Sequence, residues 1–320
     1  MTLSIKPFTH GLHDLGSGGY AWIQPDGGWG WSNAGLVVDG DESLLIDTLF
    51  DLKLTSEMLN AMSRAEPTAT SSFNTLVNTH ANGDHCNGNE LVHGAEIISS
   101  VATAAELAEE SPERLATMMR NAPSLGEAGE FLQRCFGAFD FEGITPTLPT
   151  RTFEGSMNVS VGDKEVCLKQ VGPCHTKGDI LAYVPDDKLI FTGDILFIEG
   201  HPILWVGPIA NWIHACDYML EIDVETVVPG HGPITDKRGV TAVRDYLVYI
   251  RDEANKRYQA GLPVYEAAMD ISLTDYDNWG DAERIVINVA TLYREFGSTE
   301  KTGDLFGLMA KADKARRQAT

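Results

Sequence analysis

Six consecutive residues, His80–His85 (HANGDH), bring two imidazoles and a carboxylate into one short segment. This mixture of nitrogen and oxygen donors suits a hard-to-borderline divalent ion such as zinc. The segment follows a short β-rich run, Thr75–Asn78, and contains a glycine, so it is predicted to be a polar loop at the end of a strand. Loops at strand ends are common places for chemistry. The pattern therefore predicts a metal site in this loop.

Three later motifs supply the same ligand types, each after a strand-like run: His175 in VGPCHT, Asp194 in IFTGD and His231 in VPGHG. A lone histidine is more often structural, and Asp194 alone could cap a helix or a turn. Four such motifs in order favour a shared centre instead. Together they could surround one or two ions.

The elements that must position these residues fall into two strand-rich halves. Residues 10–50 are predicted to form strands and turns, residues 51–65 a helix and residues 101–137 two or three helices. The second half holds the runs MNVSVGD, EVCLKQVG, ILAYVP, KLIFTGD and TVVPGHG. Two such halves with helices between them indicate a central β-sandwich with helices packed outside it.

We expect one continuous domain over residues 1–320, with a core at about 10–238, a helical insertion at about 101–140 and a helical extension at about 239–320. The insertion is interpreted as covering the site, although an ordinary packed helical layer fits the pattern equally well. The sequence contains no internal repeat or long linker.

Charge and composition limit the partners. Acidic residues number 46 against 24 basic ones, a net charge of -22, which disfavours nucleic acid and anionic membranes. The first residues lack an apolar signal region, and no apolar run reaches the ~18 residues of a membrane span. We therefore expect a cytoplasmic protein. Its five cysteines are unevenly spaced and are expected to be reduced, with Cys86 and Cys174 more often packing residues than ligands.

On these motifs the sequence resembles the metallo-β-lactamase superfamily across about residues 15–235. The family pattern is H-x-H-x-D-H, a later His, an Asp after a strand and a G-H-G type His. Asp47, in LLIDT, resembles an early family Asp that supports the site without contacting the metal. The resemblance implies an α+β fold, an αββα sandwich with its metals at the edge between the sheets.

The resemblance also implies a role for each ligand. His80 and His175 match the first-metal ligands, Asp194 the bridging carboxylate, and Asp84, His85 and His231 the second-metal ligands. One position departs, because Asn82 stands where the family usually has its second His. An amide oxygen is a weaker zinc ligand than imidazole, so one ion in the second position could suffice. Zinc is expected, with iron or manganese as the other options.

The implied chemistry is hydrolysis of a small ester, thioester, lactone or amide. A bound zinc ion lowers the pKa of water from 15.7 to about 7, so hydroxide is available at neutral pH to attack an electrophilic carbon. Asp84, or His80 or His175 where the first position holds no ion, could carry the proton to the leaving group.

The segment HPILWVGPIANW, which follows Asp194, is predicted to shape the substrate pocket. Its candidate wall residues are His201, Trp205, Asn211 and Trp212. The alternative, that the two tryptophans cover core, is equally favoured because large aromatics dominate burial anywhere.

Three alternatives remain open from the sequence. The first is a single-zinc hydrolytic dehalogenase, whose site has a similar composition. The second is a di-iron redox protein, which would usually carry Glu at the position of Asn82 and a fused flavin domain. The third is a metal-free binding protein, for which Asn82 is the only support. A homo-oligomer is equally open.

Overall fold

The alternation of side chains along β4 (Glu42–Ile46) shows how the molecule is layered. In the computed structural model, which describes residues 2–319, Leu44 and Ile46 pack into the space between two sheets. Leu45 points the other way and packs with Met58 and Met62 of α1 (Leu52–Ala65). Successive side chains of a strand face opposite sides of its sheet, so one short apolar run serves two cores.

The first sheet has seven strands in sequence order. Its first four strands pair antiparallel, and β4 to β7 run parallel. Besides β4, its strands are β1 (Gly11–Gly16), β2 (Gly19–Ile23), β3 (Ala34–Asp39), β5 (Thr75–Val77), β6 (Glu96–Ser100) and β7 (Arg151–Phe153).

The second sheet has five strands in the order β12-β11-β10-β9-β8, all antiparallel except the parallel pair β11 and β12. The strands are β8 (Ser156–Val161), β9 (Lys164–Gln170), β10 (Ile180–Val184), β11 (Leu189–Phe191) and β12 (Thr226–Val228).

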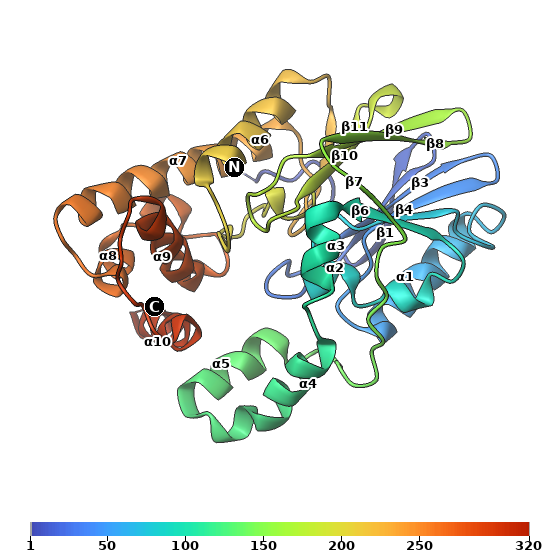
Figure 1. Ribbon diagram of the computed structural model, residues 1–320. Helices are drawn as coiled ribbons and strands as arrows, with labels where there is room; N and C mark the ends of the chain where they lie inside the picture. Colours follow the sequence, from blue (N-terminus) through green and yellow to red (C-terminus); the bar gives the residue numbers. More distant parts are fainter. Residues whose placement is uncertain (1, 320) are drawn as a thin grey trace.

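Helices cover both outer faces (Figure 1). Helix α1 lies on the first sheet, and the C-terminal helices pack with the outer face of the second sheet in one apolar cluster. This is the predicted αββα sandwich. The remaining helices are α2 (Gly83–Cys86), α3 (Val101–Leu107), α4 (Pro112–Asn121), α5 (Gly126–Phe136), α6 (Ile209–Glu221), α7 (Lys237–Gln259), α8 (Val264–Asp270), α9 (Ile285–Glu295) and α10 (Leu305–Ala319).

The predicted helical insertion forms α3, α4 and α5, and α5 packs against the last helix of the chain. The rings of Phe131 and Phe306 lie with centroids 5.0 Å apart, and Arg134 forms an ion pair with Asp313. Figure 1 shows α3 beside β6, whereas α4 and α5 lie below the sheets. The insertion therefore contacts the first sheet through α3 and joins the C-terminal extension through α5.

The long run SLLIDTLF does not continue as one strand. Strand β4 ends at Ile46, and Asp47 adopts a left-handed conformation with φ of 63°. A non-glycine residue tolerates this conformation only when its surroundings hold it there. The turn directs the Asp47 carboxylate to the residues after β5, where it accepts hydrogen bonds from Thr79.

Two further observations concern expectations from the sequence. All five cysteines, which lie within the described residues, are free thiols. Among residues 2–319, the structure contains no helix long and apolar enough to cross a membrane.

The two sheets approach closely where Gly35 of β3 faces Phe191 of β11, because any side chain on Gly35 would overlap the Phe191 ring. We predict that Gly35→Ala lowers the free energy of unfolding by about 1–3 kcal/mol, the usual cost of overpacking a core. Adding Phe191→Leu should recover part of this loss, which urea unfolding of both single variants and the double variant measures. Gly280→Ala, whose added methyl group meets open space, is the control. If the double variant lost as much free energy of unfolding as the two single variants together, the close approach of Gly35 and Phe191 would be contradicted.

Candidate metal centre

The candidate ligands gather at the carboxyl ends of parallel strands, two in each sheet. Asp47 follows β4, and the segment His80–His85 follows β5. Asp194 lies in a short 3-10 turn, η4 (Gly193–Ile195), after β11, and His231 follows β12. Because parallel strands end at the same edge, residues far apart in sequence meet there. His175, in the loop between β9 and β10, completes the cluster.

Asp47 orients two of the four imidazoles. Its Oδ2 accepts a hydrogen bond from the Thr79 hydroxyl at 2.7 Å, so Thr79 Oγ1 can only accept from His80 Nδ1, 3.0 Å away. The same Oδ2 accepts from His85 Nδ1 at 2.9 Å. Both histidines thus carry a proton on Nδ1, and each neutral ring presents a bare Nε2.

The other two imidazoles are oriented by backbone carbonyls. His175 Nδ1 donates to the carbonyl of Ile203 at 2.7 Å, and His231 Nδ1 donates to the carbonyl of Gly27 at 3.2 Å. All four histidines are buried. Four Nε2 atoms therefore converge on two carboxylates, and in their neutral forms all of these groups are hydrogen-bond acceptors.

Asp84, His85 and His231 form a group whose ligand atoms all lie within 4.8 Å of one another, and Asp194 adjoins it through His85 and His231. His85 Nε2 lies 3.1 Å from Asp194 Oδ1, and His231 Nε2 lies 3.2 Å from Asp84 Oδ2 and 3.5 Å from Asp194 Oδ1. Ligands around a tetrahedral zinc ion with bonds of about 2.0–2.1 Å lie roughly 3.3 Å apart. His85 Nε2 and Asp194 Oδ1 are buried and have no hydrogen-bond partner. The residues present fit a divalent ion at this position.

The charges of the cluster also favour a bound cation. Burial would lower the pKa of both His85 and His231, but nearby carboxylates, Asp194 foremost, raise the pKa of His85 well above its usual value and that of His231 to about 9. Burial would also raise the pKa of Asp194, yet His231 and His85 hold it well below its usual value. The carboxylates thus attract positive charge, and protons supply it where an ion does not.

The first-metal position differs because of Asn82. His175 Nε2 and His80 Nε2 lie 3.3 and 3.6 Å from Asp194 Oδ2, but Asn82 Oδ1 lies only 2.7 Å from His175 Nε2. That separation is a hydrogen-bond distance and is too short for two ligands of one ion. Asn82 Oδ1 can only accept, so this bond requires a proton on His175 Nε2 as well as on Nδ1, or an amide turned so that its NH2 faces the ring. Asn82 thus holds His175, and His80 Nε2 stays without a partner.

Asp179, which the sequence analysis did not single out, shapes the loop that presents His175. Its carboxylate accepts hydrogen bonds from the amides of Cys174 and Thr176 and from the Thr176 hydroxyl. Burial raises its pKa to about 7. Its only sequence signal is its place four residues after His175.

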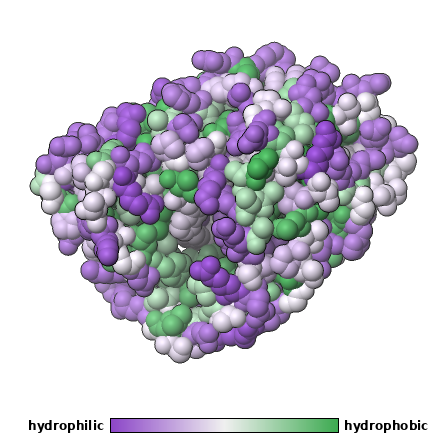
Figure 2. Space-filling view, viewed as in Figure 1, coloured by the Kyte–Doolittle hydropathy of each residue, from purple (hydrophilic) through white to green (hydrophobic). Residues whose placement is uncertain are grey.

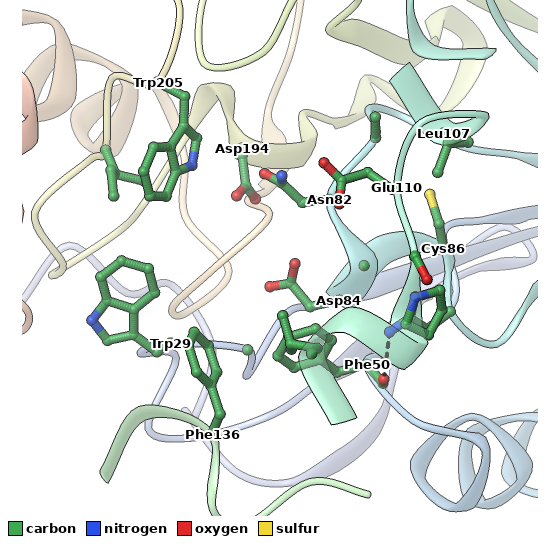
Figure 3. A pocket seen from close by; sticks show the side chains of 18 of the residues that line it. Trp29, Phe50, Asn82, Asp84, Cys86, Leu107, Glu110, Phe136, Asp194 and Trp205 are labelled. Atoms are coloured by element: carbon green, nitrogen blue, oxygen red, sulfur yellow. Dashed lines mark hydrogen bonds between the residues drawn. The ribbon is translucent and has the colours of Figure 1, made fainter. Parts of the chain in front are cut away.

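A cavity of about 290 Å³ opens over the cluster. Asp84, Asn82 and Asp194 lie at its centre, with Trp29 and Trp205 on one side and Cys86 and Leu107 on the other (Figure 3). Figure 2 shows a hollow in this face with hydrophobic residues around it. Residues from the insertion and from the extension complete the wall, among them Leu115, Met118, Phe136, Arg284 and Phe306. Side chains of the insertion thus form part of the cavity wall.

Of the four predicted wall residues, the structure places only Trp205 at the cavity. Helix α6 begins at Ile209 and turns Trp212 into the core, where its ring nitrogen donates to the Ile195 carbonyl. Asn211 faces outward and donates to the Pro173 carbonyl, and His201 is buried beside the Tyr246 hydroxyl. The proposed pocket role of these three residues thus has no support, because proximity in sequence to Asp194 does not set the direction of a helix face.

The two cysteines near the motifs form thiol hydrogen bonds to the backbone and do not lie among the candidate metal ligands. Cys86 donates its thiol hydrogen to the His80 carbonyl, and Cys174 donates to the Val171 carbonyl. Burial raises the pKa of both thiols. Neither belongs to the ligand groups that the described residues form, His80 with His85 and Asp194, and Asp84 with His85 and His231.

Residues 27–231 match the model of the metallo-beta-lactamase superfamily, so the chain belongs to that family. Among its relatives, the acyl-coenzyme A thioesterase MBLAC2 of Gallus gallus is 26% identical over 240 residues, which cover 71% of this chain and 82% of the relative. The hydroxyacylglutathione hydrolase of Brucella ovis is 38% identical over 56 residues, 18% of this chain and 22% of the relative. These relatives are hydrolases, which supports a hydrolase here.

Solved structures show the same fold. The sec-alkylsulfatase Pisa1 from Pseudomonas sp. aligns with a TM-score of 0.68 at 16% identity over 91% of this chain. This chain spans about half the length of that sulfatase, 51%. A metallo-beta-lactamase from Pontibacter korlensis aligns with a TM-score of 0.56 at 18% identity, over 75% of this chain and 99% of that structure.

The geometry at Asn82 predicts how many ions the centre binds. We expect about one zinc ion per wild-type chain and about two in Asn82→His, because imidazole is a stronger ligand than an amide. Inductively coupled plasma mass spectrometry of zinc-loaded, dialysed protein measures both. Two ions in the wild type would show that Asn82 does not close the first position, and no ion in either protein would exclude the metal centre.

The placement of His201 predicts an acid-sensitive core. Burial lowers the pKa of His201 to about 3, so below pH 6.5 the unfolded chain binds a proton that the folded chain does not. Stability from this group is therefore present above pH 6.5 and is lost as the pH falls, by about 2–3 kcal/mol at pH 4.5.

His201→Gln keeps a polar side chain that does not titrate. Urea unfolding of the metal-free proteins at pH 7.5 and 4.5 measures how much stability each protein loses on acidification. We expect the variant to lose about 2–3 kcal/mol less than the wild type. Equal losses would mean that His201 does not stay neutral in the fold.

Proposed function

We propose that this chain is a zinc-dependent hydrolase that uses one ion to cleave small thioesters or esters with a largely apolar acyl group. The observation that carries the proposal is the convergence of unpartnered acceptors, His85 Nε2 and Asp194 Oδ1, beneath an apolar cavity. The thioesterase and hydrolase names of the relatives support the choice of an acyl substrate.

Asp84, His85, Asp194 and His231 would hold the ion. A divalent ion held there would lower the pKa of a water to about 7 and polarise a carbonyl, and so would supply a nucleophile at neutral pH. The carboxylates compensate its charge, and Asp47 keeps His85 in the tautomer that leaves Nε2 free to bind.

His80 is the residue best placed to move the proton. Burial holds its pKa well below the usual value, so the ring is neutral, and its Nε2 faces the cluster without a hydrogen-bond partner. His175 cannot serve in the same way because Asn82 occupies its Nε2. In the proposed reaction water adds to the acyl carbon, the bond to sulfur or oxygen breaks, and the proton passes through His80 to the leaving group.

The cavity sets the size and character of the acyl group. A volume of about 290 Å³ corresponds to about ten water molecules, so a substrate part of roughly ten non-hydrogen atoms would fill it. The aromatic residues Trp29, Phe50, Phe136 and Trp205 form much of its wall and would exclude water from the acyl chain.

The test compares butyryl-coenzyme A with 4-nitrophenyl butyrate, following release of the thiol or the phenol. We expect chelator-treated protein to be inactive and zinc to restore hydrolysis. His85→Gln, which removes one ligand, should lower kcat/KM at least about 100-fold, whereas His10→Gln, an exposed histidine outside the cluster, is the matched control. Hydrolysis that survives both chelation and His85→Gln would contradict the proposal, as would the absence of hydrolysis by the zinc-loaded wild type.

A further inference from the structure

Among the described residues that line the cavity, Arg284 is the only lysine or arginine. It lies just before α9 in the C-terminal extension, outside the residues that match the family model. The other charged side chains of the wall include the carboxylates of Asp84, Asp194 and Glu110. A fixed positive charge in such a wall needs an explanation, because a buried arginine is rare unless it is fully paired.

The guanidinium group of Arg284 is held rigidly but is not fully paired. It donates from Nη1 to the His201 carbonyl at 3.0 Å and forms an ion pair through Nη2 with Asp281 at 3.0 Å. The side chain is only 2% exposed, and its Nε–H has no hydrogen-bond partner. A buried donor without a partner carries a desolvation penalty. An acceptor that formed a hydrogen bond with it would remove this penalty and be bound more tightly.

Aromatic rings fix the position of this charge relative to the metal centre. The guanidinium carbon lies 4.4 Å from the Trp29 ring centroid and 5.1 Å from that of Phe197. The Phe197 ring in turn stacks on the His231 imidazole, with centroids 5.0 Å apart and planes 7° from parallel. One phenyl ring therefore separates Arg284 from a candidate metal ligand, so one small molecule could reach both.

The side chains around Arg284 hold its charge at the cavity wall. Trp29, on which Arg284 stacks, lies across the cavity from Glu110 (Figure 3). The ring nitrogen of Trp29 donates to Glu283 at 2.7 Å, which holds the indole in place over the guanidinium group. Among the described residues, Asp281 is the one ion-pair partner of Arg284.

From these contacts we propose that Arg284 binds a carboxylate, and that the substrate is an acyl ester or thioester whose acyl group carries a carboxylate remote from the scissile carbonyl. The Nε–H of Arg284 donates to that carboxylate while the carbonyl lies over the metal centre. The substrate class rests on the proposed function, whereas the anion site depends only on Arg284 and its neighbours.

The test uses metal-free protein, so it does not depend on catalysis. Isothermal titration calorimetry compares 4-phenylbutyrate with its neutral analogue 4-phenylbutanamide. We expect the wild type to bind the carboxylate about 10- to 100-fold more tightly, the advantage of a hydrogen bond between charged groups. Arg284→Gln should reduce this preference to less than about threefold. Arg244→Gln, which removes an arginine of α7 that pairs with Asp217 away from the cavity, is the matched control for net charge.

Two results would overturn the proposal: equal binding of the two compounds by the wild type, or a preference that persists in Arg284→Gln. Should Arg284→Gln fail to fold, a crystal structure of the metal-free wild type with 4-phenylbutyrate decides the same point. A carboxylate oxygen within about 3.2 Å of Arg284 Nε supports the site, and a carboxylate bound among the histidines contradicts it. Failure of zinc-dependent hydrolysis with intact carboxylate binding would reject the proposed function and leave the anion site standing.

Discussion

The structure is organised around a buried excess of hydrogen-bond acceptors. Four imidazoles donate their Nδ1–H outward, to Thr79, Asp47 and two backbone carbonyls, and so turn four Nε2 atoms toward Asp84 and Asp194. Burying groups of this kind without a positive charge between them is costly. The cluster therefore needs protons or a metal ion. The packing of the two sheets, whose parallel strands end at this edge, offsets the cost of burying these acceptors.

Much of this arrangement could be predicted from the sequence, because each ligand lies in a short motif after an apolar run. The departure at Asn82 was visible too, but its hydrogen bond to His175 joins residues 93 positions apart and left no local signal. The left-handed turn at Asp47, which ends β4 at Ile46, has no signal in LLIDT.

The cavity wall was the least predictable part of the site. Its residues come from helices that meet only in the fold, as Phe136 of α5 and Phe306 of α10 do. Proximity to a ligand in sequence favoured Trp212 and His201, which the helix direction and the core packing place elsewhere. The family core thus supplies the centre and part of the cavity wall, and the insertion and the extension supply the rest of that wall.

The central claim, that one ion binds where these acceptors converge, is tested most directly by anomalous X-ray diffraction from crystals of the zinc-loaded wild type. The account predicts one zinc peak at bonding distance from Asp84, His85, Asp194 and His231, with Asn82 still hydrogen-bonded to His175. A peak bonded by His80 and His175, with Asn82 displaced, would contradict it, and so would crystals of zinc-loaded protein with no peak in the cluster.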